Sequence, residues 1–366
     1  VNVDEDYIKQ SKAQGIYPLM YYPHNVHFLS WSSMFTGRSG LAIEAALKAK
    51  SILEMGVRKS SWGSGENFRV QPIFVMVRFG KWQELLEMEK PFIKAQYLTG
   101  MWHYGRSMAY MNTGNMSAAK KELQKLQEIV TKFEEGIPGY SEGGALTNVL
   151  NLEIASSLVS GQMASMEGEF ETAIYHLGTA TRLEDSHVYT EPASWNFPTR
   201  HILGAILLEA GKPKEAEVVY WQDLAHNPNN AYSFYGLYQS LSKQGKEAEA
   251  AEYLAKATKL MPFVIDYKIK EGAFLLKQKQ LKASKRVFIL ALSLNPTIKE
   301  IHLNLGYISF LEHNFTKADL YLKQALALDP DYILAYENLA LSAQMQNKME
   351  QVKVYLNKIL EIAPNH

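Results

Sequence analysis

Residues 299–332 read KEIHLNLGYISFLEHNFTKADLYLKQALALDPDY, a 34-residue stretch that ends shortly after a proline at position 330. Prolines recur at the same spacing on both sides of it, at positions 228, 262, 296, 330 and 364. A fixed period of this length indicates a repeated supersecondary unit. Proline ends helices because it has no N–H group and clashes with the preceding turn. The spacing therefore predicts an all-α chain in which pairs of helices are repeated.

Small residues recur in the same register as the prolines. When units are counted from 197, 231, 265, 299 and 333, a small residue occupies the eighth position in four of the five units. The twentieth position is small in the first four. These residues are Gly204, Gly272, Gly306 and Ala340, then Ala216, Ala250, Ser284 and Ala318; Tyr238 and Val352 are the exceptions. We expect five regular units: 197–230, 231–264, 265–298, 299–332 and 333–366.

The N-terminal part, residues 1–196, follows the same pattern less regularly. Glycines and alanines at helix-packing spacing predict hairpins at about 154–187 and 98–131, and two cruder pairs around Gly37 and Gly80. Three segments rich in glycine, proline or polar residues interrupt this pattern, at 56–67, 133–144 and 184–197. We expect these segments to be loops that stand outside the helical stacking.

Composition limits the classes of function. The chain has 47% hydrophobic and 21% charged residues, and its Lys+Arg and Asp+Glu counts are both 38. This balance predicts no broad cationic face for nucleic acid, and the apolar runs are too short to predict membrane insertion. Cysteine is absent, so disulfides and thiolate metal sites are excluded. The chain starts at Val1, and we expect a soluble protein, cytoplasmic or exported after loss of an upstream segment.

Enzyme motifs give little support for catalysis. Gly139-Tyr140-Ser141-Glu142-Gly143 matches the G-x-S-x-G pattern of a nucleophile elbow, but that motif needs a preceding strand and here it follows a helix end and Pro138. The sequence contains no phosphate-binding glycine loop, dinucleotide fingerprint or H-E-x-x-H motif. It therefore favours a non-enzymatic protein, and we interpret 139–143 as a turn.

A histidine pair marks the first hairpin, in Tyr21-Tyr22-Pro23-His24-Asn25-Val26-His27-Phe28. His24 and His27 lie three residues apart and share a helix face. Two such imidazoles can bind a transition metal such as zinc or copper, or can polarise a polar ligand. With His103 and His201 they form the candidate metal set. The alternative is structural: the same histidines can cap helices and form hydrogen bonds between hairpins.

These features make the chain resemble tetratricopeptide repeat proteins over essentially its whole length, most clearly over 197–366. It is similar to a largely uncharacterised bacterial group through YPHNVHFL at 22–29, Gly37-Arg38 and Asn227-Pro228-Asn229-Asn230. The resemblance implies an α-solenoid, a right-handed superhelix whose concave groove holds a partner. One branch of the family binds acidic C-termini through a lysine and an asparagine at the fifth and ninth positions. Here those pairs are His201/Ala205, Tyr235/Gln239, Ile269/Ala273, Leu303/Tyr307 and Glu337/Leu341, so that clamp is absent.

Two functions remain open. In the first, the chain is an interaction scaffold without a cofactor, and Tyr104, His201, Tyr235 and Tyr307 contact a peptide or a partner protein in the groove. In the second, a metal or small-ligand site, which could be enzymatic, is built on the N-terminal histidines and aromatics under the 184–197 loop. Its candidate residues are His24, His27, Trp31, His103, Glu191, Trp195 and His201.

Overall fold

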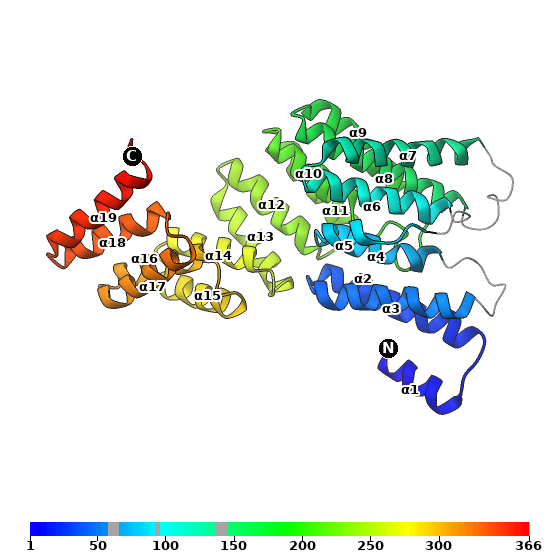
Figure 1. Cartoon of the computed structure of the whole chain (residues 1–366), viewed down its shortest axis with the longest axis horizontal. Coiled ribbons are helices and arrows are strands. Elements are labelled where there is room, and N and C mark those ends of the chain that lie inside the picture. Colours follow the sequence, from blue (N-terminus) through cyan, green and yellow to red (C-terminus); the bar gives the residue numbers. More distant parts are fainter. Residues whose placement is uncertain (58–65, 92–95, 136–144, 366) are drawn as a thin grey trace. The chain divides into compact units, whose positions relative to one another are not determined.

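The computed structural model describes residues 1–57, 66–91, 96–135 and 145–365, with side chains omitted at 53–57, 66 and 145. This part of the chain is helical and contains no strand (Figure 1). The predicted loops at 56–67 and 133–144, with the G-x-S-x-G stretch, fall largely outside the described residues. The helices are α1 (Asn2–Ser11), a single π-helical turn η1 (Tyr17–Tyr21), α2 (Tyr22–Phe35), α3 (Ser39–Val57), α4 (Glu66–Arg78), α5 (Trp82–Glu87), α6 (Gln96–Asn112), α7 (Met116–Glu134), α8 (Ala145–Met166), α9 (Phe170–Asp185), α10 (Thr199–Glu209), α11 (Pro213–His226), α12 (Ala231–Lys243), α13 (Glu247–Leu260), α14 (Ile265–Lys277), α15 (Leu281–Leu294), α16 (Lys299–Leu311), α17 (Phe315–Leu328), α18 (Ile333–Met345) and α19 (Met349–Ile362).

The helices from α11 onward keep the register that the prolines indicate. The second helix of each pair begins at 213, 247, 281, 315 and 349, so consecutive starts differ by 34 residues. The ends at 226, 260, 294, 328 and 362 follow the same spacing, two residues before each proline. The all-α solenoid of helical hairpins predicted from the sequence is therefore confirmed.

Close approach of the paired helices depends on glycines that face large side chains. A Cβ atom added to Gly204 would lie 2.4 Å from the Tyr220 ring, and one added to Gly236 would lie 2.2 Å from the same ring. Gly272 faces Phe288 in the same way, at 2.8 Å. Real Cβ atoms essentially never approach another heavy atom so closely, so a larger residue at these positions would push the helices apart.

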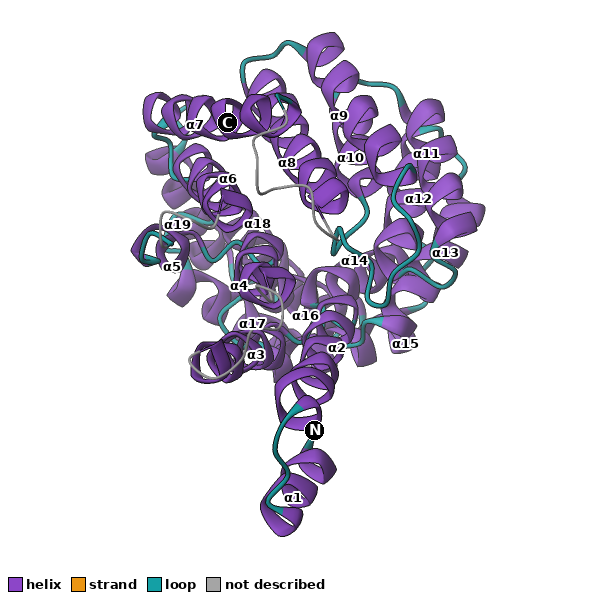
Figure 2. Ribbon diagram, turned by 90° about the vertical axis from the view of Figure 1, so that its right-hand side faces the viewer, coloured by secondary structure: helices purple, strands orange, loops and turns teal. Residues whose placement is uncertain are grey.

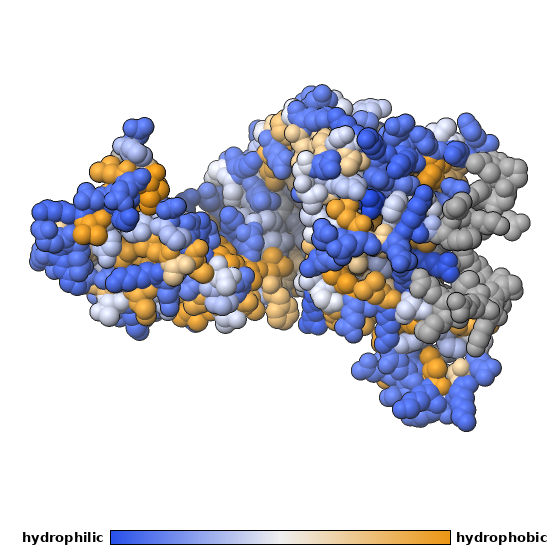
Figure 3. All heavy atoms as spheres, viewed as in Figure 1, coloured by the Kyte–Doolittle hydropathy of each residue, from blue (hydrophilic) through white to orange (hydrophobic). Residues whose placement is uncertain are grey.

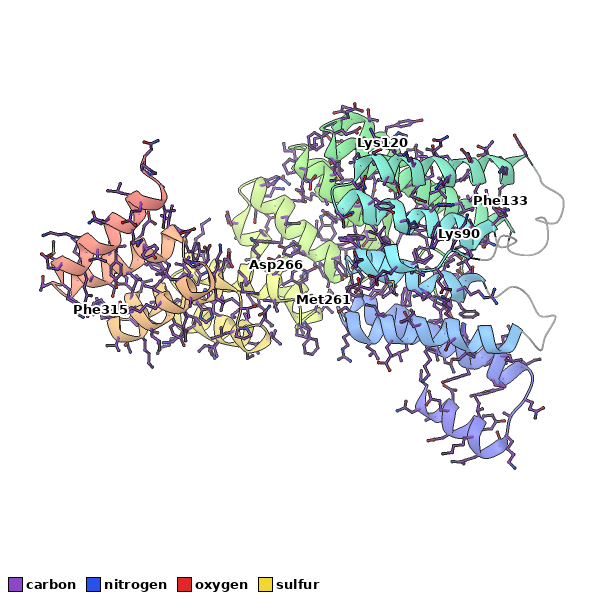
Figure 4. The ribbon with its side chains drawn as sticks, viewed as in Figure 1. Lys90, Lys120, Phe133, Met261, Asp266 and Phe315 are labelled. Carbon is purple, nitrogen blue, oxygen red and sulfur yellow. The ribbon has the colours of Figure 1, made fainter. Side chains whose placement is uncertain are left out.

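The chain divides into an N-terminal unit, Val1–Gly245, and a C-terminal unit, Lys246–His366. In the C-terminal unit, consecutive hairpins share cores such as Phe288, Ala291, Ile301, Leu305 and Ile308. Met261, labelled in Figure 4, lies between α13 and α14 and is fully buried. Each hairpin thus buries its apolar face against the next one, as expected of a solenoid.

The N-terminal unit contains the hairpins α2–α3, α4–α5, α6–α7 and α8–α9, followed by α10–α12. Successive helices from α6 to α12 lie side by side along an arc (Figure 2). The helix α1 and the turn η1 precede the first hairpin and were not predicted. They are held to it by Asp4, whose carboxylate accepts hydrogen bonds from Tyr17 at 2.7 Å and Asn25 at 3.1 Å.

The surface of the N-terminal unit is mainly polar where it can be seen. On the face shown in Figure 3, hydrophilic side chains predominate over the region of α7, with small hydrophobic patches among them. Lys120 of α7, labelled in Figure 4, forms an ion pair of 2.6 Å with Glu167, just after α8. The equal numbers of acidic and basic residues are thus accompanied by local pairing.

The segment 186–198 between α9 and α10, which contains most of the loop expected at 184–197, corrects one expectation. It was expected to stand outside the helical stacking, but its last residues are buried within the unit: Trp195 is 2% exposed and Phe197 is 3% exposed. The Trp195 ring packs edge-on against Phe74 of α4 at 4.9 Å and Tyr104 of α6 at 5.8 Å. Burial of these two aromatic rings stabilises the packed conformation of the loop, because each ring removes a large apolar area from water.

Polar contacts fix the end of this loop where α10 begins. The half-buried Glu184 carboxylate accepts hydrogen bonds from the Thr199 amide at 2.8 Å and from the Thr199 hydroxyl at 2.6 Å. Arg200 donates two hydrogen bonds to Asp185, at 2.7 and 2.6 Å. The Glu184 carboxylate accepts from the Thr199 N–H, which has no partner within α10, so the helix begins at a defined position.

The glycine contacts predict a stability change in the N-terminal unit. Gly236→Ala should lower its free energy of unfolding by about 1–3 kcal/mol, because the new methyl group would overlap the rigid Tyr220 ring. Gly178→Ala is the matched control. Its added Cβ would lie 3.5 Å from the Arg182 side chain, an ordinary contact, so the change should be neutral or stabilising.

Urea unfolding followed by tryptophan fluorescence measures this change selectively, because all six tryptophans lie between Trp31 and Trp221, inside the N-terminal unit. Equal unfolding midpoints for Gly236→Ala and Gly178→Ala would contradict the packing role of Gly236.

Candidate functional site

A pocket of about 390 Å³ lies between α10, α11, α12 and the end of α4, and we name it the α10–α12 pocket. Two residues that the sequence placed in the groove, His201 and Tyr235, lie in it together. Its lining combines aromatic rings, amides and charged groups: Arg78, Gln162, His201, Ile202, Ala205, Ile206, Glu209, Tyr220, Tyr232, Tyr235, Gly236 and Gln239.

A buried carboxylate supports this pocket from beneath. Asp223 of α11 is fully buried, and its oxygens accept hydrogen bonds from Asn227 at 2.9 Å, Asn230 at 3.0 Å and the Ser233 hydroxyl. Burial would raise the pKa of Asp223, but hydrogen bonds from His201, Ser233 and Asn227 hold it below its usual value. Asp223 therefore stays ionised and ties the end of α11 to the start of α12.

The His201 ring lies between this carboxylate and an arginine from a distant helix. Its Nε2 atom is 3.3 Å from Asp223 Oδ2 and 2.8 Å from Asn230 Nδ2, while its Nδ1 atom is 3.4 Å from Arg78 Nη2. Burial lowers the pKa of His201, the hydrogen bond to Asp223 offsets part of this effect, and the nearby Arg78 charge lowers the pKa. The ring is therefore neutral at pH 7 and positions Arg78.

Arg78 is also held by aromatic stacking. Its guanidinium carbon lies 3.6 Å from the centre of the Tyr232 ring and 5.6 Å from that of Phe197. Tyr232 in turn donates a long hydrogen bond of 3.5 Å to the Met34 carbonyl of α2. Residues near 34 and 78 thus contact residues near 200 and 232, because the N-terminal unit brings α2 and α4 against α10 and α12.

A second, smaller pocket of about 180 Å³ lies against α2 and α4, and we name it the α2–α4 pocket. It contains His24, His27 and Glu191 of the predicted ligand cluster. The loop 186–198 forms one wall, including the cis Glu191–Pro192 peptide bond. The lining residues are His24, His27, Asn67, Phe68, Val70, Phe74, Tyr97, Thr190, Glu191, Pro192, Ala193, Ser194 and Asn196.

Hydrogen bonds fix the orientation of His27 in this pocket. The Ser30 hydroxyl donates to the Ala42 carbonyl at 2.9 Å, and Gln71 Nε2 donates to Ser30 Oγ at 3.2 Å. Gln71 Oε1 must then accept, so His27 Nε2 donates to it across 2.9 Å. Burial lowers the pKa of His27 to about 4, which keeps the ring neutral.

The Asn196 side chain lies beside the His27 ring, where its contact offsets part of the effect of burial on the pKa of His27. Asn196 is 3% exposed, and its Oδ1 atom has no hydrogen-bond partner among the described residues. The pocket therefore presents a buried acceptor.

The remaining predicted residues lie apart from both pockets. His103 is buried on α6, with Nδ1 2.5 Å from Glu122 Oε2, and Trp31 packs on Phe35 at 4.6 Å. Tyr104 and Trp195 are interior residues, at 0% and 2% exposure, which a partner cannot reach. Tyr307 is 37% exposed and belongs to the C-terminal unit.

The four histidines of the candidate metal set are not brought together in the N-terminal unit. His24 and His27 share the α2–α4 pocket, whereas His103 and His201 bond to separate carboxylates. Across the described residues, no group of three or more His, Cys, Asp or Glu side chains is placed to hold a metal ion. His27, His103 and His201 make hydrogen bonds to neighbouring side chains, and the His24 ring packs edge-on against Phe28.

Sequence reasoning missed four residues of the α10–α12 pocket and its support: Arg78, Asp223, Asn230 and Tyr232. Asn230 lies in the Asn227–Asn230 stretch that carried the family resemblance, and its side chain caps α12 by accepting from the Tyr232 amide at 3.1 Å. Arg78 had no signal, because it lies 123 residues before His201.

Comparisons with known proteins identify the repeat. The sequence pattern of the family described as "Tetratricopeptide repeat" matches residues 103–129 and 299–332. The first match spans parts of α6 and α7; the second spans α16 and α17 and has the bounds of the fourth predicted unit.

Curated relatives include "Protein O-mannosyl-transferase TMTC1" of Mus musculus, 28% identical over 160 residues, which are 42% of this chain and 17% of that protein. The protein of the same name in Homo sapiens is 27% identical over 191 residues, 50% of this chain and 21% of that one. The chain thus spans about a fifth of the length of these relatives.

Similar solved structures include MamA from Desulfovibrio magneticus RS-1, with 22% identity and a TM-score of 0.43, covering 46% of this chain and 94% of MamA. PilF of Pseudomonas aeruginosa has 18% identity and a TM-score of 0.49, covering 59% and 95%. YrrB, described as "a TPR protein with an unusual peptide-binding site", has 20% identity and a TM-score of 0.42, covering 46% and 87%. Within the described ranges, no helix is both long and apolar enough to cross a membrane.

The depressed pKa of His27 predicts a pH-dependent stability. Its folded pKa of about 4 lies below the unfolded value of 6.5, so its stabilising contribution is complete above pH 6.5 and is lost as the pH falls toward 4. At 1.36 kcal/mol per pH unit this loss amounts to roughly 3 kcal/mol. In His27→Gln, whose amide can keep the bond to Gln71, the unfolding free energy should fall by roughly that much less between pH 7 and pH 4.

Urea unfolding at several pH values, followed by tryptophan fluorescence, measures the difference between the two proteins. His176→Gln, which changes a histidine of α9 outside both pockets, should retain the pH dependence of the wild type. Parallel pH profiles for wild type and His27→Gln would show that His27 titrates normally.

Proposed function

We propose that this chain, a tetratricopeptide repeat protein, is a non-enzymatic scaffold that binds a peptide segment of a partner protein in the α10–α12 pocket. The observation that carries this proposal is the construction of the pocket: aromatic and amide side chains are presented above a buried polar network that holds them in place. Rigid aromatic side chains with a polar tip contribute strongly to binding because little conformational entropy is lost when they are covered.

The support of the pocket favours binding without rearrangement. Asp223 joins α11 to α12 through Asn227, Asn230 and Ser233, so the walls formed by these two helices keep their spacing. Such preorganisation lowers the entropy cost of association. Tyr235 and Gln239 lie one turn apart on α12, so both can contact the same extended ligand.

The α2–α4 pocket favours a second candidate function, the binding of a small polar molecule. The specific observation is the buried Asn196 Oδ1 acceptor, because a buried acceptor without a donor costs about 1–3 kcal/mol. A ligand hydroxyl or amide N–H would supply that donor, while the Phe68 and Phe74 rings offer apolar contact.

The first prediction concerns Tyr235. A random peptide library displayed on phage and panned against the purified chain should yield binders, and Tyr235→Ala should weaken their Kd about tenfold or more because the ring is lost from the pocket wall. Tyr175→Ala is the matched control, since Tyr175 is 68% exposed on α9 and lies outside the pocket. Isothermal titration calorimetry gives both dissociation constants. If both substitutions weaken peptide binding equally, or if neither weakens it, the α10–α12 pocket is excluded as the peptide-binding site.

The second prediction concerns Asn196. Native mass spectrometry of the purified chain should show a stoichiometric small organic adduct, and Asn196→Leu should lose it because the acceptor is removed. Elemental analysis of the same sample separates an organic ligand from a metal. A wild-type mass equal to that of the bare polypeptide would count decisively against this second function.

A further inference from the structure

Arg78 is the unusual charged group of the α10–α12 pocket. It lies in the last turn of α4, is half-buried, and lines the pocket beside Tyr232 and His201. Stacking on Tyr232 at 3.6 Å holds the plane of the guanidinium group, and the contact with His201 uses only one of its terminal nitrogens. A guanidinium group carries five N–H donors, so most of its hydrogen-bonding capacity remains.

No carboxylate among the described residues forms an ion pair with Arg78. Asp223 belongs to the same network, but the His201 ring contacts both groups, and Asp223 already accepts hydrogen bonds from its own neighbours. Two other arginines of the same unit are paired: Arg200 with Asp185 at 2.6 Å and Arg106 with Glu122 at 3.6 Å. A half-buried cation without a counter-charge is costly, and a ligand anion would relieve that cost.

Glu209 limits how much negative charge the pocket accepts. It also lines the pocket, where its Oε2 atom accepts a long hydrogen bond of 3.4 Å from Ser165. A ligand that carried several carboxylates would place at least one of them near this like charge, which is unfavourable. The pocket therefore suits one carboxylate rather than an acidic cluster.

We propose that Arg78 makes the α10–α12 pocket selective for a peptide that carries a single carboxylate. The guanidinium group of Arg78 binds this carboxylate, which serves as its counter-ion. This inference rests on the proposed function of the pocket. Arginine and carboxylate form paired, parallel hydrogen bonds, and the stacked Arg78 is already oriented for that geometry. The carboxylate comes from an aspartate or glutamate side chain or from a peptide C-terminus.

The test uses the phage-displayed random peptide library on the full chain, panned in parallel against wild type, Arg78→Gln and Arg182→Gln. Arg182 is an exposed arginine on α9 outside the pocket, so it is the matched control. Peptides selected by wild type and by Arg182→Gln should be enriched in one Asp or Glu at a fixed position, or in a free C-terminus. This enrichment should disappear with Arg78→Gln.

Synthetic peptides then separate the two sources of the carboxylate. For a selected peptide, replacing its Glu by Gln, or amidating its C-terminus, should weaken binding about tenfold or more for whichever carboxylate is bound. Arg78→Gln should weaken binding of the parent peptide by a similar factor and leave the neutralised peptide unaffected. Arg78→Lys should give an intermediate loss, because it keeps the charge but not the paired donors.

The outcomes distinguish this inference from the proposed function. Wild type could select peptides whose binding depends on Tyr235 but which show no acidic enrichment and no response to Arg78→Gln. The proposed carboxylate selectivity would then be wrong, and the scaffold function would stand. If no peptide is selected, both fail. The peptide neutralisation needs only the wild-type chain, so it decides the question even if an Arg78 variant does not fold.

Discussion

Contact between glycine and a large side chain in the paired helices is the constraint on which the rest of the fold depends. Tyr220 fills the space left by both Gly204 and Gly236, so its ring sets the distance between α10, α11 and α12 at once. The same ring also lines the α10–α12 pocket. The packing between these helices therefore also determines the position of one wall of the candidate binding site. A change in the helix spacing would change the pocket as well.

The end of α4 contacts α10 and α12, which are more than a hundred residues further along the chain. The periodic sequence pattern does not encode this contact. Phe74 and Arg78 lie one turn apart on α4, yet they line different pockets. Between them, the buried Trp195 and Phe197 rings pack against Phe74, and Phe197 also lies against Arg78. The loop that was expected to stand outside the stacking instead lines the α2–α4 pocket and contacts Arg78 through Phe197.

The sequence predicted the hairpins because their information is local and periodic. The 34-residue spacing indicated the helix boundaries, and His201 and Tyr235, which share a position in the repeat, both line the α10–α12 pocket. It could not predict Arg78, since nothing local marks a residue whose partners are more than a hundred positions away. Nor could it show that Tyr104 and Trp195 are interior, because an aromatic side chain suits a core and a groove equally well.

The histidines show why side-chain identity alone is a weak guide to chemistry. His27 and His201 are both buried and both have a lowered pKa, which are also properties of metal ligands and catalytic bases. Their hydrogen-bond partners indicate a structural role instead. Gln71 accepts the proton of His27 Nε2, and the His201 ring lies between Asp223 and Arg78. In both cases the neutral imidazole lies beside a polar group that lines a pocket. The chemistry that a ligand meets is then that of Asn196 or Arg78, and not that of the histidine.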